Sequence, residues 1–168
     1  MPMNVETLLR AAALGAGASV LMDLWNLALR RVAGVRSLDY GLLGRWILHL
    51  PSGRFAHDPI GKAAPRKGER VVGWTAHYTI GVGFAVAFVA LVSAAWLGRP
   101  TPLPALAFGV VTVVFPYFLL QPALGFGVAS ARTPHPAQAR LKSLATHTVF
   151  GLGLYLVALA LQAVAPVA

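Results

Sequence analysis

Residues 71–97 read VVGWTAHYTIGVGFAVAFVALVSAAWL and contain no Asp, Glu, Lys or Arg. A helix needs about 20 apolar residues to cross the hydrocarbon core of a bilayer, so this stretch is long enough to span a membrane. Residues 7–29, 103–124 and 144–165 are similarly apolar. The sequence therefore predicts an all-α fold, a four-span transmembrane helical bundle.

The composition agrees with this prediction and excludes an ordinary soluble domain. Of the 168 residues, 57% are hydrophobic and 11% are charged, whereas soluble domains carry about 25% charged residues. The chain has no cysteine, which excludes disulfides, thiolate metal sites, cysteine nucleophiles and c-type haem attachment. Residues 1–168 are expected to form a single integral membrane domain.

The basic residues predict the orientation of the spans. Twelve of the fourteen Lys and Arg lie in or beside the loops that follow the first and third spans, whereas Arg10 and Arg99 lie near the other ends. The positive-inside rule then places these two loops in the cytoplasm and both termini outside. The first loop also contains a short apolar stretch, residues 37–50, which is expected to lie in the interface or against the bundle.

The net charge of +9 is explained by this orientation, because it comes mainly from the basic residues of the two predicted cytoplasmic loops. The bases are spread along linkers with few interleaved aromatic residues, which argues against a nucleic-acid partner and favours anionic lipid headgroups. Four spans are few for a transport path within one protomer, so we expect a homo-oligomer.

Polar residues near the cytoplasmic ends of the spans form the candidate ligand or proton site: Asp23, Asn26, His77, Gln121 and His147. At about 1.5 Å per residue, Asp23, His77 and His147 lie roughly 8–11 Å inside the boundary. A carboxylate at this depth costs about 2.5–3.5 kcal/mol, so Asp23 should face inward and have a partner, for which His77, His147 and Arg30 are the candidates. Polar residues at a shared depth could bind a proton or a solute. Alternatively, they only fix the register of the helices.

A short motif, H-x-x-x-G-x-G, occurs at residues 77–83 and again at residues 147–153. A duplicated helical hairpin would produce this pattern. Small residues allow close helix packing, so the motif glycines are predicted packing positions: Gly81, Gly83, Gly151 and Gly153. Haem or metal ligation by His77 and His147 is an alternative, but bulky Phe84, Phe88 and Leu154 on the same helix faces favour no cofactor.

No zinc-protease, nucleophile-elbow, phosphate-loop or dinucleotide-binding motif is present, so we expect no enzyme. Several short motifs together resemble an uncharacterised family of small bacterial multi-pass membrane proteins, a domain of unknown function: Met22-Asp23-Leu24-Trp25, Gly44-Arg45-Trp46, Arg54-Phe55-x-His57-x-Pro59-Ile60, Gly73-Trp74-x-x-His77-Tyr78, Gln121-Pro122-x-x-Gly125 and Ser143-Leu144-x-x-His147-x-x-Phe150-Gly151. The resemblance spans roughly Ser19 to Leu159. It implies a multi-pass protein of the bacterial inner membrane and carries over no activity.

Three functional hypotheses follow from these observations. The first is a small-solute or ion binding or transport protein with a protonatable Asp/His site. The second is a haem or metal protein using His77 and His147. The third is a structural or assembly subunit of a membrane complex, in which the polar residues only dock helices.

Reporter fusions test the predicted topology. Reporters fused after Lys62 and after Thr133 should report the cytoplasm, because the basic loops stay inside, and those after Pro100 and Ala168 should report the exterior. An inverted result at two or more of these positions would contradict the predicted orientation and remove the basis for a shared depth of the polar residues.

Overall fold

The structure is a computed structural model that describes residues 3–35 and 39–166. These residues contain helices, turns and irregular segments but no strand. Four candidate spans are long and apolar enough to cross a membrane: Val5–Ala33, Glu69–Val92, Pro102–Ala123 and Pro136–Val164. The prediction of an all-α fold with four candidate membrane spans is confirmed.

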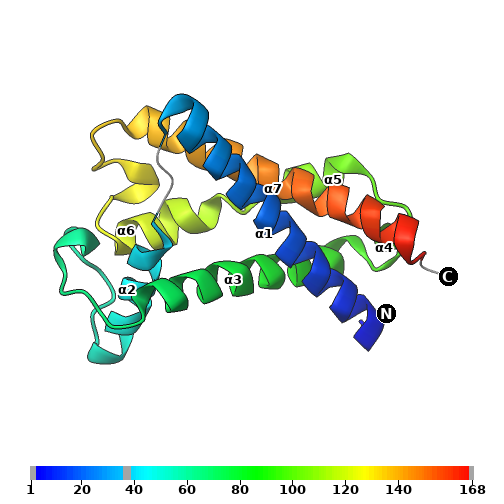
Figure 1. Ribbon diagram of the computed structural model, residues 1–168, viewed down its shortest axis with the longest axis horizontal. Coiled ribbons are helices and arrows are strands. Elements are labelled where there is room, and N and C mark those ends of the chain that lie inside the picture. The colour runs from blue at the N-terminus through cyan, green and yellow to red at the C-terminus, as the bar shows by residue number, and fades with distance from the viewer. Residues whose placement is uncertain (1–2, 36–38, 167–168) are drawn as a thin grey trace. The chain divides into compact units, whose positions relative to one another are not determined.

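Three of the candidate spans are continuous helices, namely α1 (Val5–Ala33), α3 (Glu69–Val92) and α7 (Pro136–Val164) (Figure 1). The third candidate span is interrupted: α5 (Pro102–Val111) is followed by a turn, a π-helix at Pro116–Leu120 and α6 (Gln121–Ala123). Shorter helices are α2 (Tyr40–His49) and α4 (Ala95–Gly98), with 3₁₀ turns at Leu50–Ser52, Ile60–Lys62 and Val128–Ser130.

Local sequence explains where the helices begin and end. The Asn4 side chain accepts a hydrogen bond from the Thr7 N–H at the start of α1, and Gly34 ends that helix with a φ of +65°. Helix α3 ends at Val92, five residues before the predicted end of the second span, because the chain turns at Ser93 with a φ of +77°. Helix α7 begins eight residues earlier than predicted, at Pro136, since proline is well suited to the first turn of a helix.

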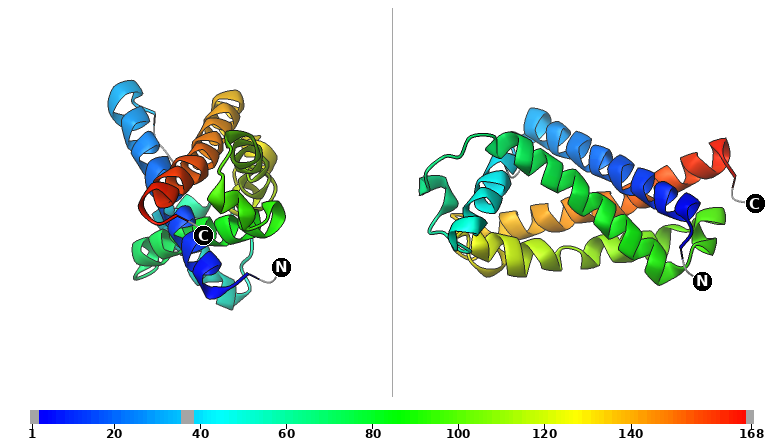
Figure 2. Two further views of the ribbon diagram at one scale, coloured as in Figure 1. Left: turned by 90° about the vertical axis from the view of Figure 1, so that its right-hand side faces the viewer. Right: turned by 90° about the horizontal axis from the view of Figure 1, so that it is seen from below.

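The chain divides into two compact units. Unit 1 contains the described residues in 3–35, 78–112 and 146–166, and unit 2 contains residues 39–77 and 113–145. In unit 1, α1 runs antiparallel to the parts of α3 and α7 that belong to the unit (Figure 2). The core of unit 1 is formed by fully buried apolar side chains such as Leu14, Ala18, Val89 and Leu154. Unit 2 contains α2, and residues 37–38 of the apolar stretch predicted there lie outside the described residues.

Glycines bring the helix backbones of unit 1 into direct contact. A Cβ atom on Gly15 of α1 would lie 2.5 Å from the Gly81 carbonyl oxygen of α3. A Cβ atom on Gly109 of α5 would lie 2.6 Å from the Cα atom of Gly151 in α7. Lipid supplies no hydrophobic force between helices, so close van der Waals packing of this kind holds membrane helices together.

Two glycine substitutions in separate helices test this packing. Gly151→Ala should lower the free energy of unfolding by about 1–3 kcal/mol, because the new methyl group would overlap the α5 backbone. Gly83→Ala is the matched control, since no atom lies within 4 Å of its Cβ position and alanine favours the helix. Unfolding in mixed detergent micelles measures both, and equal stability of the two variants would contradict the close crossing.

Candidate functional site

The carboxylate of Asp23 in α1 is hydrogen-bonded to a tyrosine of α3. The Tyr78 hydroxyl donates to Asp23 Oδ2 at 3.0 Å, and both side chains are partly buried in unit 1. Tyr78 is not among the partners predicted for Asp23 from the sequence, which are His77, His147 and Arg30. Because successive residues on a helix point about 100° apart, the residue beside His77 reaches a different neighbour.

A second acceptor lies one helical turn from this carboxylate. Asn26 is 8% exposed, and its Oδ1 atom is buried without a hydrogen-bond partner among the described residues. Residues three apart on a helix are neighbours on its surface. Asp23 and Asn26 therefore present acceptor oxygens on the same part of α1, which favours a hydrogen-bond donor or a cation over an anion.

His147 of α7 is oriented by a threonine of the third span. Its Nδ1 atom lies 2.8 Å from Thr112 Oγ1, and the Thr112 hydroxyl donates to the Gly109 carbonyl oxygen at 2.6 Å. A hydroxyl has one hydrogen, so Thr112 accepts from His147 and the hydrogen of a neutral ring lies on Nδ1. The lone pair is then on Nε2. Thr112 is 1% exposed and was not predicted as a site residue.

The other two predicted site residues belong to unit 2. The His77 ring stacks on Tyr40 of α2, with centroids 4.1 Å apart and planes inclined by 18°. Gln121 donates from Nε2 to Ser143 Oγ at 3.3 Å. The five predicted residues thus divide between the units: Asp23, Asn26 and His147 in unit 1, and His77 and Gln121 in unit 2.

The four motif glycines also have different surroundings. A side chain on Gly81 would run into Ser19 Oγ of α1, and one on Gly153 would meet Ala18 at 2.8 Å. Gly151 lies against α5 as described above, whereas no atom lies within 4 Å of the Cβ position of Gly83. Gly83 therefore makes no close contact with another backbone within the described residues.

An ion pair joins α2 to the start of α3 in unit 2. Arg45 donates from Nε and Nη2 to the two carboxylate oxygens of Glu69, each at 2.8 Å, and also donates to the Ala63 carbonyl oxygen at 3.2 Å. The hydrogen bond with Glu69 raises the pKa of Arg45 above its usual value. The helices cross closely here, because a side chain on Gly44 would run into the Glu69 backbone.

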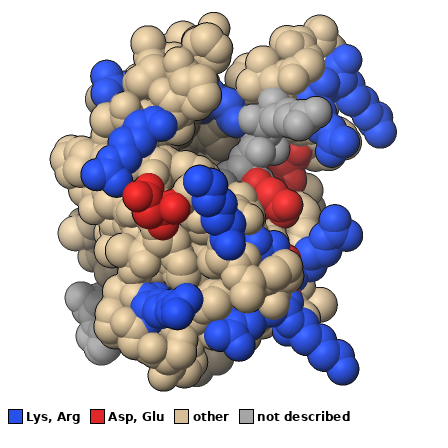
Figure 3. All heavy atoms as spheres, turned by 90° about the vertical axis from the view of Figure 1, so that its left-hand side faces the viewer, with Lys and Arg blue, Asp and Glu red and all other residues tan. Residues whose placement is uncertain are grey.

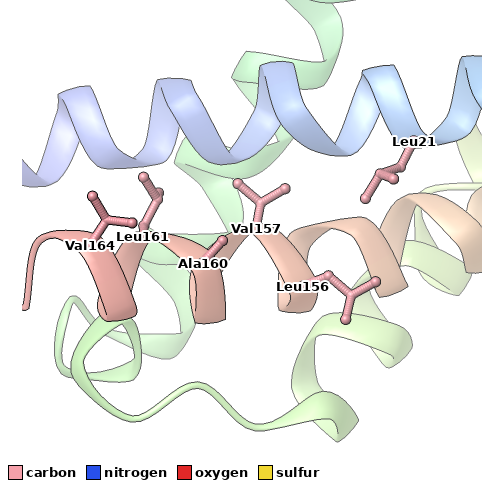
Figure 4. A pocket seen from close by; sticks show the side chains of 6 residues that line it. All are labelled: Leu21, Leu156, Val157, Ala160, Leu161 and Val164. Carbon is pink, nitrogen blue, oxygen red and sulfur yellow. The ribbon is translucent and has the colours of Figure 1, made fainter.

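An apolar groove of about 450 Å³ lies between α1 and α7 of unit 1 (Figure 4). Its lining is entirely apolar: Leu21, Leu156, Val157, Ala160, Leu161 and Val164. Such a lining suits hydrocarbon and has no group that holds a charge. The candidate site is therefore the polar cluster at Asp23 and not this groove.

The comparison with known families covers both units. A family model described as a protein of unknown function, DUF2938, matches residues 12–161. The chain belongs to this family. No curated protein and no solved structure matches the chain. The DUF2938 match includes all five predicted site residues and confirms the predicted resemblance to an uncharacterised family.

The described residues 3–35 and 39–166 contain no group of three His, Cys, Asp or Glu side chains that could hold a metal ion. His77 and His147 belong to different units, and each ring has a partner within its own unit.

The hydrogen bond of His147 predicts its tautomer. A neutral His147 ring should carry its hydrogen on Nδ1, and Thr112→Val should shift the ratio of the two tautomers about two- to tenfold, because a hydrogen bond contributes about 0.5–1.5 kcal/mol. Nitrogen NMR chemical shifts of labelled His147 measure this ratio. Thr112→Ser is the control and should keep the Nδ1–H form; a Thr112→Val spectrum identical to wild type would contradict the assignment.

Proposed function

We propose that this DUF2938 protein is a multi-pass protein of the bacterial inner membrane that binds, and moves across the bilayer, a proton or a small cation. The observation that carries this proposal is the Asp23 carboxylate, which lies within a candidate membrane span and accepts a hydrogen bond from Tyr78. A carboxylate is costly at such a position and typically marks an ion or proton pathway.

The chemistry around Asp23 supports a positively charged ligand. The Tyr78 hydroxyl stabilises the charged carboxylate, and the Asn26 amide oxygen provides a further acceptor on the same helix. A proton or a small cation would satisfy both oxygens, whereas an anion would be repelled. His147 is a further titratable group of unit 1, and Thr112 orients its ring.

The charge of unit 2 supports cytoplasmic loops beside anionic lipid headgroups, with both termini outside. The described residues of unit 2 contain nine Lys and Arg but three acidic residues. Figure 3 shows a face on which Lys and Arg side chains gather. Glu69 is held by Arg45, so it does not neutralise the exposed bases of the unit: Arg54, Lys62, Arg66, Lys67, Arg70, Arg132 and Arg140. Each exposed base near an anionic membrane surface contributes about 1 kcal/mol of attraction.

A structural subunit is the second candidate, and the hydrogen bond of His147 to Thr112 favours it. In that case the polar contacts only set the register of the helices. Removing the Asp23 carboxylate or the Tyr78 hydroxyl would then lower the stability of the protein. Ions would cross membranes that contain the wild type or either variant no faster than protein-free membranes.

Flux into liposomes tests the transport proposal. The purified protein should acidify vesicles that contain a pH-sensitive dye when an inward proton gradient is applied, with Na⁺ and K⁺ gradients as parallel arms. Asp23→Asn should reduce the protein-dependent rate at least tenfold, because it removes the charge but keeps the shape, and Asp23→Glu should keep part of it.

Glu6→Gln is the matched control for this experiment. Glu6 lies on the same helix, is 64% exposed in its side chain and pairs with Arg10, so the variant should move protons at the wild-type rate. Infrared difference spectroscopy across the pH range provides a second measurement, in which a protonated carboxyl band should disappear in Asp23→Asn. A flux and a carboxyl band that are both unchanged in Asp23→Asn would overturn the proposal.

A further inference from the structure

A loop of unit 2 is attached to the turn that follows the third candidate span. The His57 N–H donates to the Ala123 carbonyl oxygen at 2.9 Å, and the Ile60 N–H donates to the Leu124 carbonyl oxygen at 3.0 Å. Ile60 is fully buried. Gly125 has a φ of +86°, and a side chain there would run into the His57 backbone oxygen. Residues 57–60 therefore dock on residues 123–125 through backbone contacts that depend on a glycine.

The His57 ring at this contact faces a second histidine. The rings of His57 and His49 meet edge to face, with centroids 5.1 Å apart. His57 Nε2 is buried and has no hydrogen-bond partner among the described residues. A protonated His57 would place an N–H donor at this position, where no described acceptor receives it, so the docked loop favours the neutral ring.

His49 cannot supply the missing acceptor. It is 2% exposed, its Nε2 atom lies 3.1 Å from the Ala64 carbonyl oxygen, and its Nδ1 atom lies 3.4 Å from Arg66 Nη2. A carbonyl oxygen only accepts and a guanidinium only donates, so the neutral His49 ring carries its hydrogen on Nε2. Both ring nitrogens of His49 are thus occupied, and neither can accept a hydrogen bond from His57.

The charged groups around His57 are mainly basic. Arg54 lies on the same loop, and Arg66 precedes α3 and contacts His49. The nearby carboxylate, Asp58, is 85% exposed and lies 3.9 Å from Arg132, so it is screened by water and already has a cationic neighbour. Arg45 is paired with Glu69, and residues 123–125 carry no charged side chain. Burial, followed by His49 and Arg54, lowers the pKa of His57 below its ordinary value of 6.5.

We propose that His57 is a proton-binding site whose protonation releases residues 57–60 from the turn at residues 123–125. The turn directly follows Gln121 and Pro122 at the end of the third candidate span. Acidification on the side of the membrane that this loop faces would therefore free the end of that span. The proposal does not depend on Asp23 or on the flux proposed above.

The direction of the pH dependence follows from linkage. The pKa of His57 is lower in the docked loop than in the released loop, where it is close to the ordinary value of 6.5. Docking is therefore fully favourable above that pH. Below it, the ratio of docked to released loop falls by up to tenfold per pH unit until the docked His57 itself is protonated.

Distance measurements between two spin labels test this proposal. The chain has no cysteine, so labels can be attached at Phe55→Cys and Val128→Cys, two positions that are 67% and 51% exposed. The full-length protein in lipid nanodiscs should give one narrow distance distribution at about pH 8 and a growing second population below about pH 6.5. His57→Gln should lose this change, whereas His135→Gln, which alters an exposed histidine, should keep it.

Two further measurements keep the proposal testable if His57→Gln fails to fold. Gly125→Ala should show the released population at every pH, because the new methyl group blocks docking and does not titrate. An NMR titration should give His57 a pKa below 6.5 in the wild type and close to 6.5 in Gly125→Ala. A wild-type value at or above 6.5, or the same pH response in His57→Gln and wild type, would overturn the proposal.

Discussion

Backbone contact at glycines is the constraint on which the packing of both units depends. Gly15 with Gly81 and Gly109 with Gly151 join helices in unit 1, and Gly44 and Gly73 let α2 cross α3 in unit 2. In hydrocarbon the hydrophobic effect does not draw helices together, so contact area and hydrogen bonds must do so. Where backbones touch, short side chains can reach across the contact. Ser19 over Gly81 and Thr112 beside Gly109 are positioned in this way.

The fold and the positions of polar residues along the candidate spans could be predicted from the sequence, but the contacts with Tyr78 and Thr112 could not. The length of a span is set by the thickness of the bilayer, so the sequence of residues 71–97 identifies a candidate membrane span without knowledge of its neighbours. Depth along a span is also readable, because each helical residue advances about 1.5 Å. The direction of a side chain around the helix requires the neighbouring helices. Asp23 therefore lies in a span as predicted, yet its described partner is Tyr78, and His147 is held by a threonine.

The third candidate span shows the same limit in its backbone. Pro116 and Pro122 lack backbone N–H groups, so a regular helix would leave carbonyl groups unpaired near both. The chain instead forms a π-helix at Pro116–Leu120, and two side chains connect this region to α7: the Tyr117 hydroxyl donates to the Arg140 carbonyl oxygen at 2.6 Å, and Gln121 donates to Ser143. The prolines reveal that the helix is interrupted. The form of the interruption depends on partners more than twenty residues away in the chain.

Many motif residues that lie outside the candidate spans make structural contacts within unit 2. Arg45 forms an ion pair with Glu69, and Trp46 donates to the Phe55 carbonyl oxygen. The lack of a side chain at Gly125 lets the backbone of His57 pack against it. These contacts involve backbone carbonyl groups, an ion pair and a glycine, which together fix the path of a loop between two spans. A loop held so closely transmits a change at one contact to the next. Protonation of His57 therefore acts on the turn after Gln121, and the polar groups of unit 2 can regulate a span without binding a ligand.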